Sequence, residues 1–397
     1  MITRRGLLHF AAGTAVLSAT ELERRIGQKD FRGLTREELP TPCMILDQDL
    51  FEKNLKTMAQ HNKASGLSLR AHVKIHKSTE ISRRQLELGA TGVCCATIAE
   101  CELMASAGVK GILFTCQPSG KQKIMRVVQL AKKEPTFHCV TDDVIIAGQL
   151  DEAAGAAGAK LNVCVDVFAG LTRQGCQPGA KALELAQKVA SSKNLRLAGL
   201  MAYSGDASHT KIFTERKKRS AADLAGMLET AEMCKKSGLP VAIKTGGSTG
   251  TYNIDSGSLT EIQAGSYIFM DTAYLKIGGQ SSDKVYDDFK EALTVMTTVV
   301  SKTRPGVCSI DAGNKAMLRT TDSVKDRPEV QVQNQGAEYG LLVWKDGDRD
   351  YRVGDRVEIY PTNLDTSTNV YDRYYVARGE KIVDAWPIMG RAGAAHR

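Results

Sequence analysis

The sequence predicts an α/β protein in two parts, a (β/α)8 barrel of the TIM type followed by a smaller, mostly β domain. Strand-like and helix-like segments alternate through the middle of the chain, and eight such strands fit the roughly 250 residues typical of this barrel. An open dinucleotide-binding sheet would need Gly-x-Gly-x-x-Gly after its first strand, and the sequence lacks it there. After Met270 the pattern changes to short strands between Gly and Asp turns, which predicts the second domain.

The individual elements are predicted from apolar periodicity and from turn residues at their ends. Barrel strands are expected at residues 67–74, 92–96, 111–115, 137–140, 161–166, 197–203, 241–245 and 261–264. Helices are expected at residues 80–87, 99–107, 142–157, 180–191 and 214–237. Strands of the second domain are expected at residues 291–301, 330–333, 339–344, 356–360, 374–378 and 381–385. We therefore assign residues 21–280 to the barrel with an N-terminal lead-in, and residues 281–397 to the β-rich domain.

The composition is that of an ordinary soluble globular protein, with 42% hydrophobic and 25% charged residues among 397. The formal net charge of +8 is modest for this length. Arg83-Arg84 and Lys217-Lys218-Arg219 are not interleaved with aromatic residues, so we interpret them as solvated helix faces and expect no nucleic-acid partner. No apolar run approaches the roughly 20 residues of a membrane-spanning helix, so no membrane partner is expected.

The N-terminus carries Arg4-Arg5 before a mildly apolar, small-residue run that continues through Ala19. This pattern is typical of a twin-arginine export signal, with cleavage near Ala19, and predicts a periplasmic protein with a signal segment at residues 1–20. The alternative is the N-terminal arm of a cytoplasmic protein. The ten cysteines form no Cys-x-x-Cys pair, and several lie in apolar strands as small core residues, which suits a protein that folds before export.

The first barrel strand has a basic face. Its alternation places Leu69 and Ala71 on one side, and Arg70, His72 and Lys74 on the other. Because unpaired charges are costly to bury, this face is expected to meet water, an anionic group or a cofactor. Lys74 would then lie at the carboxyl end of the strand, where barrel enzymes place their active sites. The alternative is a solvated edge strand with scattered basic residues.

Two glycine-rich loops follow the predicted seventh and eighth strands. Gly246-Gly247-Ser248-Thr249-Gly250 follows the seventh, and Gly265-Ser266-Tyr267 follows the eighth. Glycines let backbone N–H groups approach a phosphate, and hydroxyl groups add further donors. A phosphate site at these loops, facing a lysine at the end of the first strand, predicts pyridoxal 5′-phosphate held by a Schiff base to Lys74.

Longer stretches of the chain resemble one enzyme family. They lie between Leu39 and nearly the end of the chain, and comprise residues 71–78, 92–95, 202–205, 246–250, 263–271 and 383–387. With these stretches the sequence resembles the D-threonine aldolase/D-serine dehydratase family of fold-type III pyridoxal-phosphate enzymes, whose barrel is like that of alanine racemase. The resemblance implies a homodimer in which the β domain of one subunit faces the barrel of the other.

The resemblance also implies roles for individual residues. Lys74 would be the Schiff-base lysine with His72 beside it in the site, Arg173 would lie near the phenolic oxygen of the cofactor, and Tyr203 would face its pyridine ring. The phosphate would be held by Gly247, Ser248, Thr249, Gly265, Ser266 and Tyr267. Tyr203 as barrel filling and His72 as a structural histidine remain the alternatives.

One departure from the family concerns its divalent metal, which a histidine and a nearby cysteine or aspartate bind after a Pro-x sequence. Here Pro361-Thr362-Asn363-Leu364-Asp365 has Asn363 in the histidine position, and the family's Glu-His-Gly is Glu338-Tyr339-Gly340. Asp365 and Asn363 form an all-oxygen pair, which would suit Mg²⁺ or Ca²⁺ weakly and does not suit zinc. The residues therefore predict a protein without stoichiometric zinc or manganese.

The resemblance implies a lyase that acts on a D-β-hydroxy-α-amino acid by retro-aldol cleavage, as a D-threonine aldolase does. One alternative is a metal-independent amino-acid racemase or epimerase, with Lys74 as one catalytic base and Tyr339 as the opposite one. Another is a D-serine-type dehydratase. A pyridoxal-phosphate carrier without enzymatic activity is a third, and the presence of a β domain argues against it.

Overall fold

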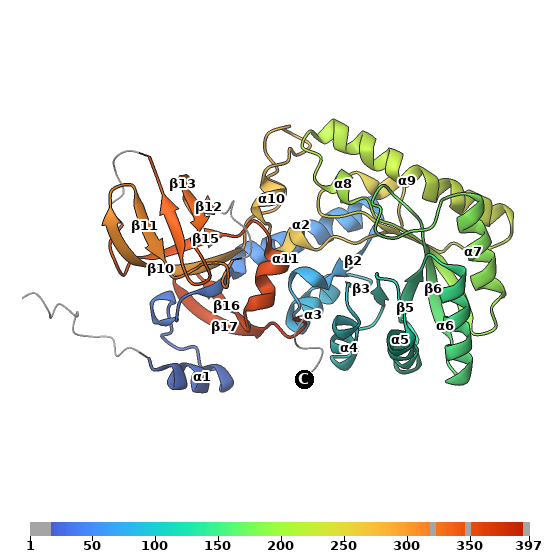
Figure 1. Ribbon diagram of the computed structural model, residues 1–397, viewed down its shortest axis with the longest axis horizontal. Helices are drawn as coiled ribbons and strands as arrows, with labels where there is room; N and C mark the ends of the chain where they lie inside the picture. Colours follow the sequence, from blue (N-terminus) through green and yellow to red (C-terminus); the bar gives the residue numbers. More distant parts are fainter. Residues whose placement is uncertain (1–16, 318–322, 346–350, 392–397) are drawn as a thin grey trace, which may run out of the picture.

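The computed structural model describes residues 17–317, 323–345 and 351–391. Eight parallel strands close into a barrel, which lies at the right in Figure 1. The last barrel strand pairs back with the first, Ser68 opposite Glu261. The strands are β2 (Ser68–His72), β3 (Gly92–Cys95), β4 (Ile112–Phe114), β5 (His138–Thr141), β6 (Leu161–Asp166), β7 (Leu195–Ala202), β8 (Ile243–Gly246) and β9 (Glu261–Ile262). All eight predicted strands are confirmed, with ends shifted by at most two residues.

Helices cover the outside of the barrel between consecutive strands (Figure 1). The longer ones are α2 (Gln48–Ser65), α3 (Thr79–Glu87), α4 (Ile98–Ser106), α5 (Lys121–Lys133), α6 (Val144–Ala156), α7 (Ala180–Ser191) and α9 (Phe213–Lys236). Short helices follow β7 and β9, at α8 (Gly205–Ser208) and α10 (Thr272–Leu275). The five predicted helices are confirmed, whereas α2 and α5 lie outside the sequence prediction. Single 3₁₀ turns are η1 (Arg36–Glu38), η2 (Val73–Ile75), η3 (Asp255–Gly257), η4 (Ser266–Ile268) and η5 (Thr368–Val370).

An ion pair lies inside the barrel between the neighbouring strands β2 and β9. Arg70 Nε and Nη2 donate to the two carboxylate oxygens of Glu261 at 2.8 and 2.5 Å, and both side chains are at least nine-tenths buried. Arg70 also donates to the backbone oxygen of Gly111. The predicted anionic partner of the basic strand face is therefore, for Arg70, a carboxylate of the protein. Cys94 and Cys164 lie in the apolar layer of the barrel interior, which confirms that they are small core residues.

The second part is a nine-stranded, mostly antiparallel sheet, at the left in Figure 1. In spatial order the strands are β11 (Val307–Ile310), β14 (Gly340–Val343), β13 (Arg327–Asn334), β12 (Ser323–Val324), β15 (Arg356–Tyr360), β10 (Leu293–Arg304), β1 (Cys43–Asp47), β16 (Arg373–Arg378) and β17 (Lys381–Pro387). Helix α11 (Leu364–Ser367) follows β15 and faces the barrel. The six predicted strands of this part are confirmed, and β11 and β12 are additional.

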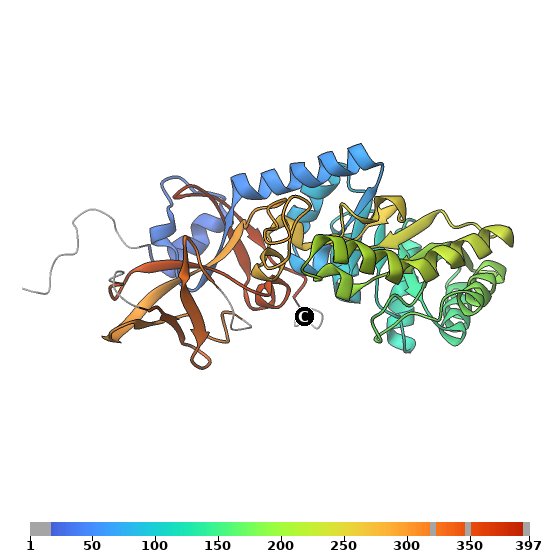
Figure 2. The same cartoon turned by 90° about the horizontal axis from the view of Figure 1, so that it is seen from above.

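The N-terminal lead-in belongs to the sheet, which corrects the assignment of residues 21–47 to the barrel. Strand β1 lies between β10 and β16, antiparallel to the first and parallel to the second. Its apolar residues are buried because both faces of this central strand are covered. Helix α1 (Ala19–Gly27) packs on the same sheet through Leu22. From β1 the chain passes to the barrel along α2, which bridges the two parts (Figure 2).

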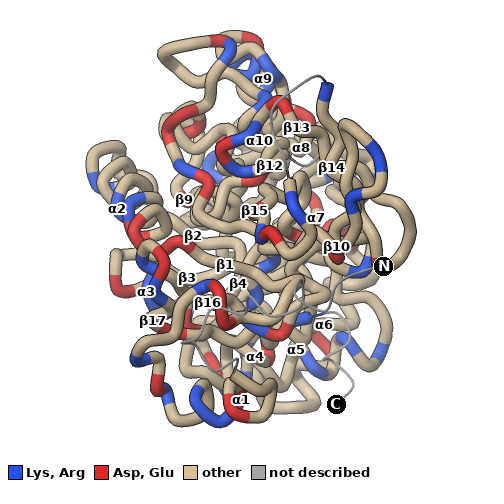
Figure 3. The backbone as a smooth tube through the Cα atoms, turned by 90° about the vertical axis from the view of Figure 1, so that its left-hand side faces the viewer, with Lys and Arg blue, Asp and Glu red and all other residues tan. Residues whose placement is uncertain are grey.

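Arg4-Arg5 and the apolar run of the predicted export signal lie almost entirely outside the described residues. Within the residues that are described, no helix combines the length and the apolar character that crossing a membrane requires. Basic and acidic residues alternate over the backbone without separating into regions of one sign (Figure 3). Arg83 and Arg84 are paired with Glu80 on the surface of α3.

Candidate active site

A cavity of about 480 Å³ opens at the carboxyl ends of the barrel strands, where a loop of the β domain covers the barrel mouth. Its walls come from the segments that follow the barrel strands, and its roof from Thr362, Asn363 and Asp365. The predicted site residues that line it are His72, Lys74, Arg173, Tyr203, Ser248, Thr249, Gly265, Ser266, Asn363 and Asp365. The structure therefore brings these predicted residues together around one cavity, from segments nearly 300 positions apart.

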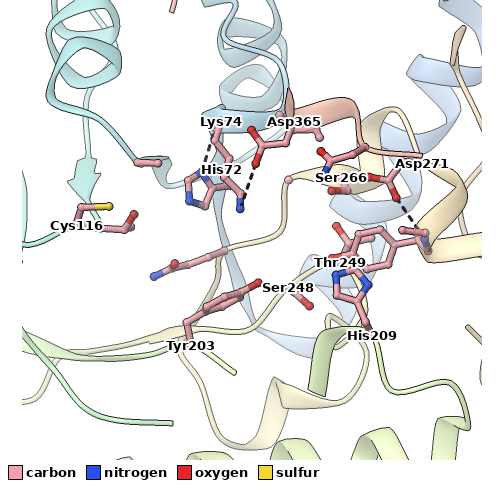
Figure 4. A pocket seen from close by; sticks show the side chains of 18 of the residues that line it. His72, Lys74, Cys116, Tyr203, His209, Ser248, Thr249, Ser266, Asp271 and Asp365 are labelled. Carbon is pink, nitrogen blue, oxygen red and sulfur yellow. Dashed lines mark hydrogen bonds and ion pairs between the residues drawn. The ribbon is translucent and has the colours of Figure 1, made fainter. Parts of the chain in front are cut away.

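Lys74 is presented by the 3₁₀ turn η2, directly after β2. The strand ends at His72, two residues earlier than predicted, because the backbone of the next three residues coils into that turn. The side chain of Lys74 is 40% exposed, and its Nζ lies 3.5 Å from Asp365 Oδ2. Figure 4 shows the Lys74 and Asp365 side chains next to each other on one side of the cavity, with Tyr203 and Ser248 on the other side.

Lys77, the other lysine of this turn, is turned away and buried. Its Nζ donates to the backbone oxygen of Lys74, to Asp365 O at 2.9 Å, to Asp365 Oδ1 at 3.4 Å and to Thr368 Oγ1 at 3.1 Å. Burial lowers the pKa of Lys77, and Asp365 offsets part of this effect. With its hydrogens occupied by protein oxygens, Lys77 has a structural role, and Lys74 is the amine that reaches the cavity.

Two histidines of the turn are held neutral. Burial, reinforced by the charge of Lys74, lowers the pKa of His72 well below its usual value, and burial lowers that of His76 to about 3. His72 Nδ1 accepts a hydrogen bond from the Lys74 amide at 3.4 Å, so the ring fixes the backbone from which Lys74 projects. His76 lies in the core, where its Nδ1 accepts from the Ser78 amide at 3.1 Å.

The glycine-rich loops after β8 and β9 meet on one side of the cavity. Ser248, Thr249 and Ser266 present hydroxyl groups there (Figure 4). A Cβ on Gly265 would lie 2.9 Å from the backbone oxygen of His72, so only glycine allows this close approach. Gly247 lies one residue outside the cavity wall and supplies the turn, with a φ of +67°.

Tyr274 completes this group of hydroxyls, and the sequence reasoning missed it. Its ring lines the cavity, and its hydroxyl is placed beside those of Ser248 and Ser266. Burial raises the pKa of Tyr274 well above its usual value, so the phenol stays protonated and acts as a donor. Tyr274 lies in the short helix α10 after the eighth strand, three residues beyond the family-like stretch at residues 263–271, and that proximity is the only sequence signal for it.

The side chain of Tyr267, one of the loop residues predicted to hold the phosphate, points away from the cavity. Its hydroxyl accepts a hydrogen bond from Gln85 at 3.0 Å inside the core, and the side chain does not line the cavity. Only its backbone amide serves the loop, donating to Thr249 Oγ1 at 3.0 Å. Tyr339 is also outside the cavity of this chain, because it lies before β14 and is 54% exposed at the surface of the β domain.

Arg173 and Tyr203 lie together at the wall opposite Lys74. The guanidinium of Arg173 is 5.3 Å from the centroid of the Tyr203 ring, a cation–π distance. Next to Arg173, the side-chain amide of Gln174 donates a hydrogen bond from Nε2 to Asp166 Oδ2 at 2.7 Å. Burial, followed by the nearby charge of Asp142, raises the pKa of Asp166 to about 7. The loop that carries Arg173 is thereby fixed to the end of β6.

Asp271 and His209 are two further residues of the cavity that the sequence did not single out. Asp271 caps α10 by accepting the Tyr274 amide at 3.3 Å, and burial raises its pKa to about 7. The His209 ring lies 4.7 Å from that of Tyr274. His209 lies outside the family-like stretches, and Asp271 ends the stretch at residues 263–271 without a role assigned to it, so it is the three-dimensional structure that places both in the site.

The candidate metal ligands do not fit a metal ion. Asn363 Oδ1 accepts the Thr366 amide at 3.1 Å and so caps α11. The two carboxylate oxygens of Asp365 lie beside the ammonium groups of Lys77 and Lys74. Across residues 17–317, 323–345 and 351–391, no three His, Cys, Asp or Glu side chains are grouped as a metal site would need.

The same site does fit pyridoxal 5′-phosphate. The amine of Lys74 is open to the cavity, the glycine and hydroxyl loops form a cradle for a phosphate, and Tyr203 offers an aromatic face. Fold and site together define a class, the barrel enzymes of the alanine-racemase type. In that class the cofactor is pyridoxal 5′-phosphate.

Known proteins agree with this class. Residues 46–273 match the family model described as the N-terminal domain of alanine racemase, and residues 292–377 match a serine dehydratase domain. The chain is 33% identical over 367 residues to the 3-hydroxy-D-aspartate aldolase of Paracoccus denitrificans (strain Pd 1222), covering 90% of this chain and 94% of that one. It is 33% identical over 357 residues to the D-threonine aldolase of an Arthrobacter species, covering 88% and 92%.

A solved structure gives the same result. The D-threonine aldolase from Filomicrobium marinum superposes with a TM-score of 0.84 at 33% sequence identity, over 90% of this chain and 96% of that one. The chain belongs to the D-threonine aldolase/D-serine dehydratase family, which has an alanine-racemase-like barrel and consists of lyases.

Proposed function

We propose that the protein is a pyridoxal-phosphate-dependent aldolase that cleaves a D-β-hydroxy-α-amino acid into glycine and an aldehyde. The observation that carries the proposal is the position of Lys74, whose amine enters a cavity that also holds the hydroxyl groups of Ser248, Thr249 and Ser266. Relatives that are 33% identical over about nine-tenths of the chain are named aldolases of such substrates, which supports the reaction class.

The bound cofactor supplies an electron-accepting ring, which stabilises negative charge at Cα after a bond to that carbon breaks. The residues of this chain do the rest. Lys74 would carry the cofactor through its amine and give up that place to the amino group of the substrate. The phenol of Tyr274 and the serine hydroxyls would hold the phosphate. His72, neutral because of its lowered pKa, fixes the Lys74 backbone without adding charge. A carboxylate in the cavity is available for the β-hydroxyl proton.

Dehydration is the second candidate, because a relative that is 25% identical is the D-threo-3-hydroxyaspartate dehydratase of Delftia sp. (strain HT23). Loss of hydroxide requires an acid or a metal at the leaving oxygen. The group beside Lys74 Nζ is the carboxylate of Asp365, which accepts a proton and does not assist a leaving hydroxide. This observation favours cleavage of the Cα–Cβ bond. A racemase would need a base opposite Lys74, and within a single chain Tyr339 does not reach this cavity.

The test begins with the purified protein and its spectrum. We expect a yellow chromophore that borohydride fixes to the chain, and Lys74→Ala should lose both. D-Threonine should then give glycine and acetaldehyde in equal amounts, measured by chromatography and by coupled reduction of the aldehyde. Appearance of L-isomer or of a 2-oxo acid in place of glycine would assign the protein to racemisation or dehydration.

We also propose that the protein is a homodimer in which the β domain of each subunit faces the barrel of the other. The family resemblance supports this arrangement, and the exposure of Tyr339 on the β domain is consistent with a contact at that surface. Light scattering during size-exclusion chromatography measures the mass of the particle. A value near the 43.0 kDa of one chain would exclude the dimer.

Periplasmic export remains a proposal as well, supported by Arg4-Arg5 and the apolar run behind them. We infer that replacing both arginines with lysine retains the protein in the cytoplasm with its N-terminal segment intact. Fractionation followed by N-terminal mass spectrometry measures this. Wild-type protein found intact in the cytoplasm would contradict the export signal.

A further inference from the structure

We propose that Asp365 is the base that removes the β-hydroxyl proton of the substrate, and that the protein cleaves its substrate without a divalent metal. The inference rests on the proposed aldolase function and assigns a residue to its central step. It follows from three features of the loop that covers the barrel mouth: how Asp365 is held, what it faces, and which ligand positions are already occupied.

Asp365 is held by a buried ammonium. Lys77, whose side chain is 4% exposed, contacts Asp365 Oδ1 at 3.4 Å and the Asp365 backbone oxygen at 2.9 Å. This fixes one carboxylate oxygen and the backbone of the loop, and leaves Oδ2 to the cavity. The 2.9 Å hydrogen bond holds the loop backbone, and the longer ion pair to Oδ1 orients the carboxylate before any substrate binds.

The free oxygen faces the reacting position. Asp365 Oδ2 is 3.5 Å from Lys74 Nζ, and Figure 4 shows the two groups side by side above the cavity. With the cofactor bound, the amino nitrogen of a substrate would take the place of Lys74 Nζ, and the β-hydroxyl oxygen is three bonds from that nitrogen. A β-hydroxyl directed toward the covering loop would lie within hydrogen-bond reach of Oδ2, which is the geometry that a general base requires.

The alternative use of Asp365, as a metal ligand, conflicts with its surroundings. The buried Lys77 ammonium next to this carboxylate disfavours a divalent cation, and Asn363 Oδ1 already accepts the Thr366 amide at 3.1 Å. Asp271, the other carboxylate of the cavity, is 8% exposed and accepts the Tyr274 amide at 3.3 Å. Asp365 is thus the carboxylate that is both half-exposed and adjacent to the reacting amine.

The step is balanced without a co-reactant. The hydroxyl proton passes to Asp365 Oδ2, the Cα–Cβ bond breaks, and the oxygen becomes the carbonyl of the departing aldehyde. The electron pair of the broken bond stays with Cα, and a proton delivered there completes glycine. One proton leaves the substrate and one returns, so the products contain all atoms of the amino acid. A base at this position drives this cleavage and gives no assistance to dehydration.

The first experiment separates the hydroxyl step from the rest of the reaction. Asp365→Asn should keep the yellow chromophore and should still exchange the α-hydrogen of glycine with solvent deuterium, followed by NMR. Its kcat/KM for D-threonine should fall by about 10²–10⁴-fold, the usual contribution of a general base. The matched control is Asp372→Asn, on the same domain, where the carboxylate pairs with Arg391 and its side chain is 69% exposed. It should leave cleavage and exchange unchanged.

Two outcomes of this experiment overturn the proposal. Cleavage that persists in Asp365→Asn shows that another group takes the proton. If Asp365→Asn loses both cleavage and glycine exchange while the chromophore remains, Asp365 has a general role at Cα or in the geometry of the site. If the wild type exchanges glycine but cleaves no β-hydroxy amino acid, the aldolase function itself fails, which is a distinguishable result.

The second experiment concerns the metal. The purified wild type, measured by mass spectrometry of its elements, should hold no stoichiometric zinc or manganese, and chelator should leave D-threonine cleavage unchanged. Asn363→His should bind Mn²⁺ more tightly than the wild type by isothermal titration, because it restores a nitrogen ligand next to Asp365. Stoichiometric metal in the wild type, with cleavage lost on chelation and restored by Mn²⁺, would refute the inference and leave the aldolase function standing.

Discussion

Replacing Lys77 with methionine tests how the site is held together. The Lys77 ammonium donates to backbone oxygens of Lys74 and Asp365, to the Asp365 carboxylate and to Thr368. Methionine has a similar volume and no donor, so these acceptors lose their partner. Breaking a buried charge pair costs about 3–5 kcal/mol, and because water reaches the 38% exposed side chain of Asp365, we expect about 3 kcal/mol, the lower end.

The expected change in thermal stability follows from the chain length. An unfolding entropy of about 2.1 cal/mol/K per residue gives about 0.8 kcal/mol/K for 397 residues, so the variant should unfold about 4 °C below the wild type. Circular dichroism measures the transition. The control is Lys56→Met on the exposed surface of α2, which should change stability by less than about 0.5 kcal/mol. A melting temperature of Lys77→Met equal to that of this control would show that the buried contacts do not stabilise the protein.

Methionine variants of Lys77 and Lys74 should have opposite effects on the absorbance spectrum of the cofactor. Lys77→Met should keep the yellow chromophore and its borohydride-fixed adduct, because Lys74 still provides the amine. Lys74→Met should lose both, with little change in the melting temperature, because its side chain is 40% exposed. A chromophore lost in Lys77→Met and kept in Lys74→Met would reverse the roles of the two residues.

Three further variants test other parts of the structure. Burial raises the pKa of Asp166 from 3.8 to about 7, so the native state holds a proton that the unfolded chain has lost in that range, and its stability falls as the pH rises. Asp166→Asn should therefore gain melting temperature relative to the wild type between pH 4 and pH 8, and a constant difference would contradict the shift. Gly265→Ala places a Cβ 2.9 Å from the His72 backbone oxygen, and should weaken cofactor binding about tenfold in a titration of the apoprotein; unchanged affinity would place the phosphate elsewhere. Arg70→Met leaves Glu261 buried without its partner and should cost about 3–5 kcal/mol in denaturant unfolding, whereas the double variant with Glu261→Met should cost much less.

The barrel and much of its site could be predicted because they depend on local patterns. Buried parallel strands and amphipathic helices have recognisable periods, and a lysine after the first strand with glycine loops after the last two identifies the mouth of the barrel. The direction of each side chain in a tight turn could not be predicted. In η4, Ser266 enters the cavity while its neighbour Tyr267 turns into the core toward Gln85, because consecutive residues of a 3₁₀ turn point about a third of a turn apart.

Long-range pairing explains the other differences. Strand β1 has the same apolar character as a barrel strand, and only its pairing with β10 and β16, more than 240 residues away, assigns it to the second sheet. Tyr274 lies on the short helix α10 after the barrel and Asp271 caps that helix, where no spacing reveals that the chain turns back over the cavity. The predicted role of Asp365 as a metal ligand came from motif position alone, and its contact with two ammonium groups depends on the fold.

The turn that carries Lys74 and the β domain form one structural unit, so the site cannot be attributed to the barrel alone. Lys77 adopts a φ of +52°, which turns its backbone toward the β domain, where its oxygen accepts the amides of Met389 and Gly390 at 3.0 and 3.1 Å. The next residue back, His76, accepts the hydroxyl of Tyr374 at 2.7 Å through its own backbone oxygen. With the contact of Lys77 to Asp365, three separate segments of the β domain hold a single turn of the barrel. A change in how the β domain packs would therefore move the reacting amine and its neighbouring carboxylate together, which preserves their distance while altering their position over the cofactor cradle.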